Sequence, residues 1–316
     1  RFVRSGGEEV KQLTLMPVKQ IKVNNIKKTL TYLLSNGNAT KMDLVSNTGL
    51  SNTTLSECIN NLCRLNIVTD TGFEESIGGR RPSIYSINSN YGCFIGISID
   101  EHGVKASVVD FSGNLIKSFP ICKLGVKSII TSVYDMIEQI ITEFKSKNIL
   151  AIGIGATGTI DYSLGIILNS DELNWHNVHL KELIERKFFI PTFIDHKINN
   201  ATFYESLLGN ARNTNNFMFL CDDYTNKVGV YANGQILRGE SNLAGTISHL
   251  KVGIDELRII KEFLSLNLML LGYKNMDCTL KCNEDLRHFK IDDDYFAKVS
   301  AVAAEVSWYE SIYFIM

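Results

Sequence analysis

The chain has 316 residues, of which 45% are hydrophobic, and this is enough apolar material for two or three domains with separate cores. It shows neither a signal peptide nor an apolar run long enough to span a bilayer, so we expect a soluble, cytoplasmic protein without membrane contacts. The formal net charge of −2 hides an asymmetry, because residues 1–90 carry 11 Lys and Arg against seven Asp and Glu, whereas the remainder carries 21 against 27. A basic first part predicts nucleic-acid contacts at that end.

Residues 1–17 are polar, mixed in charge and without hydrophobic periodicity, so a flexible lead-in is predicted there. The composition then predicts one domain from residue 18 to residue 90. It opens with a helix whose apolar side chains repeat at helical spacing. These side chains are Val23, Ile26, Leu30, Leu33 and Leu34.

Two short helices joined by a glycine turn follow. Thr40 and Asp43 form a capping box that starts the first helix, which ends at Gly49, and Ser51 is the expected N-cap of the second. A pair of helices with this spacing is typical of a helix-turn-helix. The inner sides are predicted to carry Met42, Leu44 and Val45 in the first helix and Leu55, Ile59 and Leu62 in the second.

The outer side of the second helix carries short polar side chains that can meet base edges in a DNA groove. Residues 67–70 and 83–88 alternate like strands around a loop with two arginines before Pro82, which is typical of a wing that contacts phosphates or the minor groove. A small helical bundle with a solvated basic loop is the alternative. The residues predicted to contact double-stranded DNA are Lys41, Ser51, Asn52, Thr53, Thr54, Ser56, Asn60, Arg80 and Arg81.

The pattern changes after residue 90. Three strands connected as a meander are predicted first, then a helix and a buried strand, and this order predicts an α/β domain. The strands are expected at residues 93–100, 104–110 and 115–119, the helix at 128–147 and the buried strand at 149–154.

Five segments of this second part are similar, in order and spacing, to motifs of one family. Residues 96–114 are similar to its first nucleotide-phosphate segment. The other matching segments are residues 153–161 (PG-x-hydrophobic-D, with Thr157 in place of the proline), Trp175 and Leu180 (the N-L-x-x-W region), residues 194–205 (V-E-N-D-A-N-A-A-A-L-G-E), and Ala244, Gly245 and His249 (A-G-E-x-G-H).

The chain therefore resembles the ROK family (repressors, open reading frames, kinases), and within it the repressor branch typified by xylose and N-acetylglucosamine repressors. The resemblance implies an α/β fold in which an N-terminal winged helix-turn-helix precedes a two-lobed actin-like domain, with lobes at residues 91–200 and 201–316. Apolar helices are predicted at residues 254–271 and 292–316. Because the family continues with another strand and helix, the C-terminal part is expected to be shortened.

The departures from the family concern catalysis. The resemblance implies an aspartate as the base of the kinases, and Lys197 falls on that position, where an ammonium cannot accept a proton. In the first phosphate loop, residues 98–102, two carboxylates replace two glycines, and the glycine-rich second loop is replaced by residues 223–230. We therefore expect no ATP-dependent phosphotransfer and no enzyme activity.

The sugar-binding positions implied by the resemblance fall on Asp171, His196 and Thr246, and only His249 is unchanged. We predict that these four residues and Lys197 form a ligand-binding cluster. Lys197 and His196 would select an anionic ligand, such as a sugar phosphate or an acid sugar. The alternative is a remnant cleft that binds nothing and is held by an Asp171–Lys197 ion pair.

No metal and no cofactor are expected. The zinc site implied by the resemblance combines His249 with three closely spaced cysteines, and no such run follows His249 here. Cys278 and Cys282 could share a metal, with His288 nearby, but this leaves too few ligands for a closed tetrahedral site. The seven cysteines are odd in number and scattered, so no disulfide framework is expected either.

Together these features predict a transcriptional regulator, a repressor in preference to an activator, that binds an operator as a homodimer or homotetramer and senses a sugar or an acidic sugar derivative. Two alternatives stay open. One is a sugar kinase with an appended DNA-binding head. The other is a regulator controlled by a protein partner instead of a small ligand.

Overall fold

The computed structural model describes residues 6–73, 82–123, 128–212, 214–219, 227–247 and 295–308. The chain divides into two compact units, the first built on residues up to Tyr91 and the second on Gly92–Ala304. The sequence analysis placed the boundary between the two parts one residue earlier, after Asn90. Of the helices within the described ranges, none combines the length and the apolar character that a membrane crossing needs.

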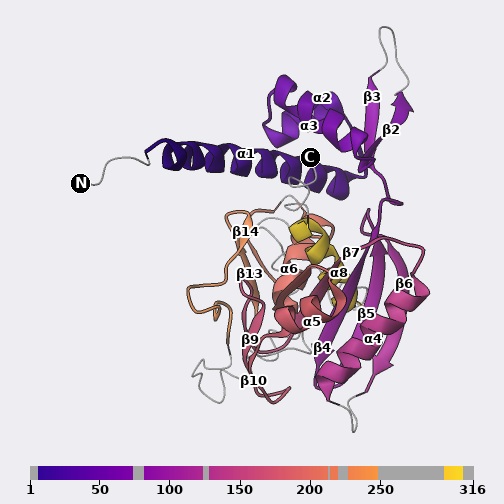
Figure 1. The fold of residues 1–316 in the computed structure, drawn as a ribbon, viewed down its shortest axis with the longest axis vertical. Helices are drawn as coiled ribbons and strands as arrows, with labels where there is room; N and C mark the ends of the chain where they lie inside the picture. Colours follow the sequence, from indigo (N-terminus) through magenta and orange to yellow (C-terminus); the bar gives the residue numbers. More distant parts are fainter. Residues whose placement is uncertain are drawn as a thin grey trace, which may run out of the picture. The chain divides into compact units, whose positions relative to one another are not determined.

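Up to Tyr91, the described residues of the first unit form the helices α1, α2 and α3, which Figure 1 labels, and a small antiparallel sheet with strand order β1-β3-β2. Strand β1 was missed by the sequence analysis, because three residues are too few for an alternating pattern to show. The elements are α1 (Gly6–Asn36), β1 (Asn38–Thr40), α2 (Lys41–Thr48), α3 (Asn52–Arg64), β2 (Val68–Phe73) and β3 (Ser83–Ile87).

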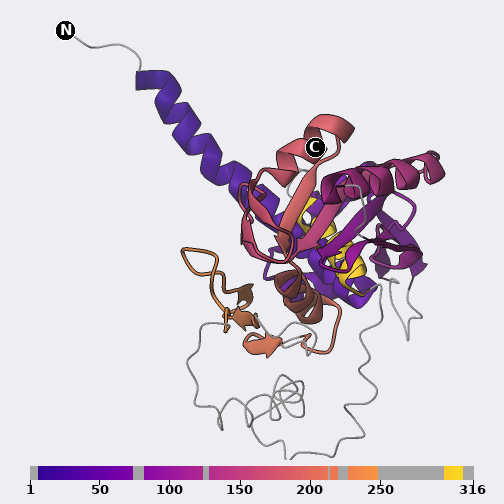
Figure 2. The same cartoon turned by 90° about the horizontal axis from the view of Figure 1, so that it is seen from below.

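Helix α1 corrects the prediction for the start of the chain. It begins at Gly6 and continues unbroken to Asn36, as Figures 1 and 2 show, so residues 6–17 are helical and not a flexible lead-in. These residues carry no apolar stripe of helical period, and without such a stripe the sequence gives no periodic sign of a helix.

The capping prediction for the helix-turn-helix is confirmed. The Thr40 hydroxyl accepts a hydrogen bond from the Asp43 amide at 3.3 Å, and the Asp43 carboxylate accepts one from the Thr40 amide at 2.9 Å. The hydrogen bonds from Thr40 lower the pKa of Asp43. Gly49 ends α2 with a φ of 69°, and the Ser51 hydroxyl accepts from the Thr54 amide at the start of α3.

The core of the first unit lies between α1, α2 and α3. The predicted inner residues of α3 are buried, as is Leu44 of α2. Met42 was predicted to lie on the inner side, but its side chain is 78% exposed, because a helix of only eight residues has one inward-facing row, and Leu44 and Thr48 fill it. Among the side chains that the structure describes, the buried apolar residues of α1 and α3 are Ile26, Leu30, Leu33, Leu34, Leu55, Cys58, Ile59 and Leu62.

The second unit is built on a five-stranded sheet with strand order β11-β7-β4-β5-β6. Strands β4, β7 and β11 run parallel to one another, whereas β5 and β6 complete the predicted meander as antiparallel neighbours. Helix α4 (Ile129–Glu143) starts at the Ser128 cap, within the predicted helical range. The strands are β4 (Cys93–Asp100), β5 (Gly103–Asp110), β6 (Leu115–Cys122), β7 (Ile149–Ala156) and β11 (Thr192–His196).

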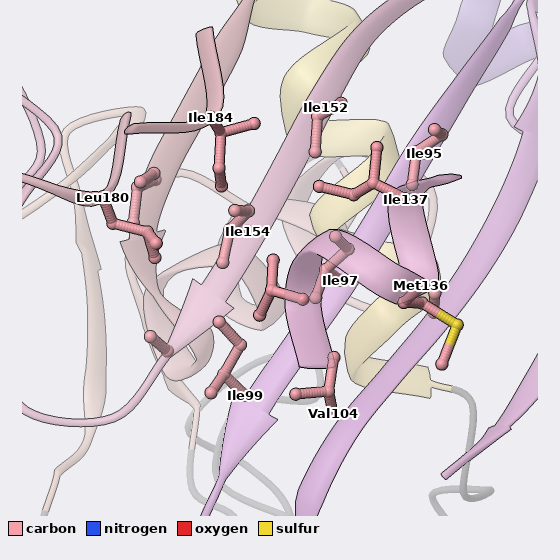
Figure 3. Close-up of a cluster of buried hydrophobic side chains, with 14 of the residues drawn as sticks. Ile95, Ile97, Ile99, Val104, Met136, Ile137, Ile152, Ile154, Leu180 and Ile184 are labelled. Carbon is pink, nitrogen blue, oxygen red and sulfur yellow. The ribbon is translucent and has the colours of Figure 1, made fainter. Parts of the chain in front are cut away.

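The two faces of this sheet are covered by different helices. On one face Ile95, Ile97 and Ile99 of β4 pack with Met136 and Ile137 of α4 in one apolar cluster (Figure 3). Because side chains alternate along a strand, the residues between these isoleucines point to the opposite face. That face meets helix α8 (Tyr295–Trp308).

Helix α8 packs directly against the backbone of two strands. A Cβ atom added at Gly96 would lie 1.8 Å from the Ala297 carbonyl oxygen, and one added at Gly153 would lie 1.8 Å from the Ser300 carbonyl oxygen. These contacts correct the predicted lobes, since residues assigned to the second lobe complete the sheet of the first. The predicted lobe boundary at residue 200 also falls inside helix α6 (Lys197–Leu207).

Two smaller sheets flank α6 and the five-stranded sheet. One has the order β10-β9-β8 and the other β12-β13-β14, and the second of these packs against α6. The predicted helix at residues 254–271 lies outside the described residues, and of the helix predicted at 292–316 the structure describes residues 295–308. The remaining elements are β8 (Thr159–Asp161), β9 (Ile166–Ser170), β10 (Trp175–Val178), α5 (Leu180–Phe188), β12 (Phe217–Phe219), β13 (Gly229–Ala232) and β14 (Gln235–Ile236).

We predict that Gly153→Ala destabilises the second unit by about 1–3 kcal/mol or more, because the added methyl group meets a main-chain carbonyl that moves only if α8 moves. Thermal unfolding followed by circular dichroism measures this change. Ala303→Ser, on a partly exposed position of the same helix, is the matched control and should leave the melting temperature nearly unchanged. An unchanged melting temperature for Gly153→Ala would contradict the close packing of α8.

Candidate functional site

The outer face of α3 presents an exposed row of short polar side chains. Asn52, Thr53 and Asn60 are exposed, and their side chains make no hydrogen bond to another described residue. The other predicted DNA contacts of this segment are partly engaged within the helix. Ser51 and Thr54 share a hydrogen bond at the cap, and the Ser56 hydroxyl donates to the Asn52 carbonyl at 2.5 Å.

Two cations lie on the helix-turn-helix. Lys41, a predicted contact, begins α2 and is partly exposed. Arg64 was missed by the sequence analysis. It is exposed and follows Asn60 by one helical turn, so it extends the same face with a positive charge. Arg80 and Arg81, between β2 and β3, lie outside the described residues.

A second candidate site lies where the central strands of the five-stranded sheet end. Strand β4 ends at Asp100, and β11 ends at His196, directly before Lys197 opens α6. Because β4 and β11 are both parallel to β7, their C-terminal ends meet at one edge of the sheet. This is the edge at which ligands bind in many α/β proteins.

Lys197 is fully buried and forms an ion pair with Asp100, with 3.0 Å between Nζ and Oδ2. Burial lowers the pKa of Lys197, and the carboxylates of Asp100, Glu101 and Glu172 act in the opposite direction. The alternative that paired Lys197 with Asp171 is wrong about the partner. Asp171 is exposed and accepts a hydrogen bond from the Asn169 side chain at 3.1 Å.

Asp100 also closes the turn between β4 and β5. Its Oδ1 atom accepts a hydrogen bond from the His102 amide at 3.0 Å, while its Oδ2 atom faces Lys197. The His102 amide, which could otherwise donate to a phosphate, thus donates to the Asp100 carboxylate of the same turn. The turn presents negative charge in its place, since Glu101 follows directly.

His196 is buried and caps α6, since its Nδ1 atom accepts a hydrogen bond from the Ile198 amide at 3.1 Å. Burial and the nearby charges of Lys227 and Lys197 hold the pKa of His196 well below 6.5. The imidazole is therefore neutral at physiological pH, and its proton resides on Nε2. The prediction that His196 and Lys197 together select an anion does not fit this arrangement, because one is uncharged and the other is already paired.

Lys227 and Thr246 face each other in an isolated antiparallel bridge, and the charge of Lys227 acts on His196. Close by, the Arg238 guanidinium donates to Asp195 from Nη2 at 2.7 Å and from Nε at 3.1 Å, and it lies 4.1 Å from the centre of the Tyr162 ring.

The structure thus places His196 and Lys197 of the predicted cluster next to each other at the start of α6, pairs Thr246 with Lys227, and leaves Asp171 exposed. His249 lies outside the described residues. The sequence analysis missed Lys227 and Arg238. Lys227 could have been noticed, because it is a charged residue in the segment 223–230 that replaces the glycine-rich loop of the family. Within the described ranges no three His, Cys, Asp or Glu side chains gather as metal ligands, and Cys278, Cys282 and His288 lie outside these ranges.

Comparison with known proteins identifies the family. Residues 94–267, more than half of the chain, match the sequence profile of the ROK family. The chain belongs to the ROK family. A xylose repressor from Bacillus spizizenii is 30% identical to it over 236 residues, which cover 73% of this chain and 61% of the repressor. A glucokinase from Halalkalibacterium halodurans is 26% identical over 164 residues, half of each chain. This ROK chain therefore spans less than two thirds of the length of the relatives it matches.

A solved structure agrees with the fold. The ROK family transcriptional regulator described as a homologue of the Escherichia coli MLC protein superposes with a TM-score of 0.61 at 16% identity. The match covers 74% of this chain and 61% of that one. At this level of identity the agreement concerns the fold alone, and the predicted α/β fold of a ROK regulator is confirmed.

We predict that acid destabilises this ROK chain through His196. The unfolded chain binds a proton at this residue below about pH 6.5, whereas the folded chain, with its lowered pKa, does not, so stability is complete above pH 6.5 and falls below it. The loss approaches about 1.4 kcal/mol per pH unit. His196→Asn retains a capping side chain and should remove this part of the pH dependence.

Urea unfolding between pH 7.5 and pH 5.5 measures the effect. His176→Asn is the control, because His176 is exposed and its replacement should leave the pH dependence as it is. Equal pH dependence in the wild type and in His196→Asn would show that His196 is not held neutral.

Proposed function

We propose that the chain is a DNA-binding transcriptional regulator of the ROK family, acting in the cytoplasm as a repressor. The observation that carries the proposal is the exposed polar face of α3, which Arg64 extends with a positive charge and which the β2–β3 hairpin follows along the chain. Short side chains let a helix approach base edges closely, and cations beside it contact the backbone. The xylose repressor among its relatives supports the same function.

The partner is a double-stranded operator. In a homodimer or homotetramer, two copies of the first unit contact two half-sites spaced by a whole number of helical turns. The second unit senses a carbohydrate, which is a neutral sugar, a sugar phosphate or an acid sugar, at the edge where β4 and β11 end. Ligand binding there shifts the chain between two conformations that differ in operator affinity.

The second unit does not phosphorylate its ligand. The base position implied by the family motif holds Lys197, whose ammonium is buried against Asp100. The carboxylate of Asp100 is in turn engaged by Lys197 and by the His102 amide, so it is not placed to take a proton from a sugar hydroxyl.

We predict that Asn60→Ala weakens binding to a selected operator by about 1–3 kcal/mol while leaving non-specific DNA affinity nearly unchanged, because a base contact carries specificity. The operator is first obtained by selection from random duplex DNA, and affinity is then measured by fluorescence anisotropy. Asn36→Ala, an exposed position of α1, is the control. Undiminished operator affinity in Asn60→Ala would reject the proposed contact face.

We also predict that the purified chain releases no ADP above background when supplied with ATP, magnesium and a panel of sugars, because Lys197 cannot act as the base. A coupled assay measures this, with an active ROK glucokinase as the positive control. Sugar-dependent turnover that Lys197→Met abolishes would instead establish a kinase with a DNA-binding head.

Control by a protein partner is the remaining alternative. Capture of one partner from lysate, together with operator affinity that no sugar alters, would favour it over a small-molecule effector.

A further inference from the structure

A cavity of about 220 Å³ lies in the first unit between α1 and α3, two helices that contact each other (Figure 1). From α1 it is lined by Ile21, Lys22, Asn25 and Ile26, which are spaced by three or four residues in pairs and so share one side of that helix. Ile26 is buried, whereas Ile21 is 57% exposed. The cavity therefore combines an apolar interior with an apolar side chain that solvent reaches.

From α3 the cavity is lined by Thr54, Glu57, Cys58 and Asn61. Cys58 is buried, and burial raises the pKa of its thiol to about 11, so this part of the wall is uncharged at physiological pH. The cavity occupies a different side of α3 from the polar row proposed to meet DNA. Asn60 of that row and its neighbour Asn61 point about 100° apart around the helix axis. A partner at the cavity thus leaves the DNA-facing row accessible.

The polar residues around the cavity carry one charge of each sign. Lys22 and Glu57 have side chains that are 52% and 67% exposed, with 3.7 Å between Nζ and Oε1. An exposed ion pair of this kind is weak, so its members can exchange partners. Asn25 and Asn61 are partly exposed, and their side-chain amides make no hydrogen bond to another described residue. An amide both donates and accepts, so it can pair with an identical amide.

This combination of groups is complementary to itself. In a two-fold dimer both copies use the same surface, so a contact from one residue to another is matched by the reverse contact. Lys22 of one copy then faces Glu57 of the other at two equivalent places. A strongly acidic or strongly basic partner would instead meet a like charge at one of these two residues. The charges therefore favour a second copy of the chain as the occupant.

We propose that this cavity joins the first units of two copies of the chain. Ile21 of each copy enters the cavity of the other, and Lys22 of each copy pairs with Glu57 of the other. Burial of Ile21 stabilises the dimer, and the two ion pairs fix its register. The inference rests on the proposed function in one respect, namely that two copies of the first unit act together on an operator, and it adds the surface that holds them together.

The test reverses charges in two separately prepared full chains. Lys22→Glu and Glu57→Lys each place like charges at both contacts of a homodimer, whereas a mixed dimer of the two variants has opposite charges at both. After subunit exchange, native mass spectrometry should show a ratio of mixed dimers to homodimers at least about tenfold above the statistical ratio. Within one chain each variant keeps two like charges, so an ion pair that acts only within single chains produces no excess.

Two controls separate this contact from other effects of charge and polarity. The mixture of Lys117→Glu and Glu143→Lys reverses an exposed ion pair of the second unit and should give the statistical ratio. Ile21→Asp, added to both charge variants, should abolish the excess of mixed dimers, because it places a carboxylate in an apolar cavity. Ile116→Asp, at an exposed isoleucine of the second unit, should preserve the excess.

An independent measurement needs no substitution. Isotope-labelled and unlabelled wild-type chains are mixed and treated with a carbodiimide, which joins a carboxylate to a neighbouring amine as an amide with loss of water. Mass spectrometry should find Lys22 of a labelled chain linked to Glu57 of an unlabelled one. A statistical ratio of mixed dimers, links found only within single chains, or a wild type that stays monomeric would each overturn the inference.

Operator affinity is measured on the same preparations, so that the two proposals fail separately. A chain that binds its operator without this contact rejects the dimer surface alone. A chain that forms the contact but binds no duplex DNA rejects the proposed function and leaves the dimer surface in place.

Discussion

The ion pair between Lys197 and Asp100 sets the chemistry of the sheet edge at which the candidate ligand site lies. A fully buried ammonium remains charged only beside a carboxylate, and removing one member of such a pair costs about 3–5 kcal/mol. The pair joins the start of α6 to the end of β4, which lies two strands away from β11 in the sheet. It also fixes the turn after β4, since the same carboxylate accepts the His102 amide. One electrostatic constraint therefore orients a helix, a strand end and a turn.

The two buried lysines that act on His196, Lys197 and Lys227, have different electrostatic surroundings. Lys197 is neutralised within the protein, and three carboxylates act on it. Among the described residues, Asp195 is the carboxylate that acts on Lys227, and it also forms an ion pair with Arg238. Burial and the charges of both lysines lower the pKa of His196. The residue at the predicted base position and the second buried lysine thus differ in their electrostatic surroundings.

Local features of this fold could be predicted from the sequence, and distant ones could not. The capping box of Thr40 and Asp43, the meander and the inward row of α3 depend on neighbouring residues, and the structure agrees with them. The polar start of α1 and the exposure of Met42 were mispredicted, because hydrophobic patterning says little about polar or very short helices.

The candidate ligand site stays a prediction. Motif spacing predicted one cluster of His196, Lys197 and Thr246. The ion pair of Lys197 with Asp100 and the bridge of Thr246 to Lys227 depend on side-chain directions and on contacts between distant segments. No spacing rule contains that information.

The packing of α8 against Gly96 and Gly153 also affects how the protein folds during synthesis. The two glycines precede the helix residues that they touch by most of the length of the second unit. During synthesis, one face of the five-stranded sheet therefore stays uncovered until α8 has left the ribosome. Contacts between such distant segments slow folding and leave partly folded chains prone to aggregation. Expression at low temperature or with chaperones should raise the yield of this protein more than changes to its surface.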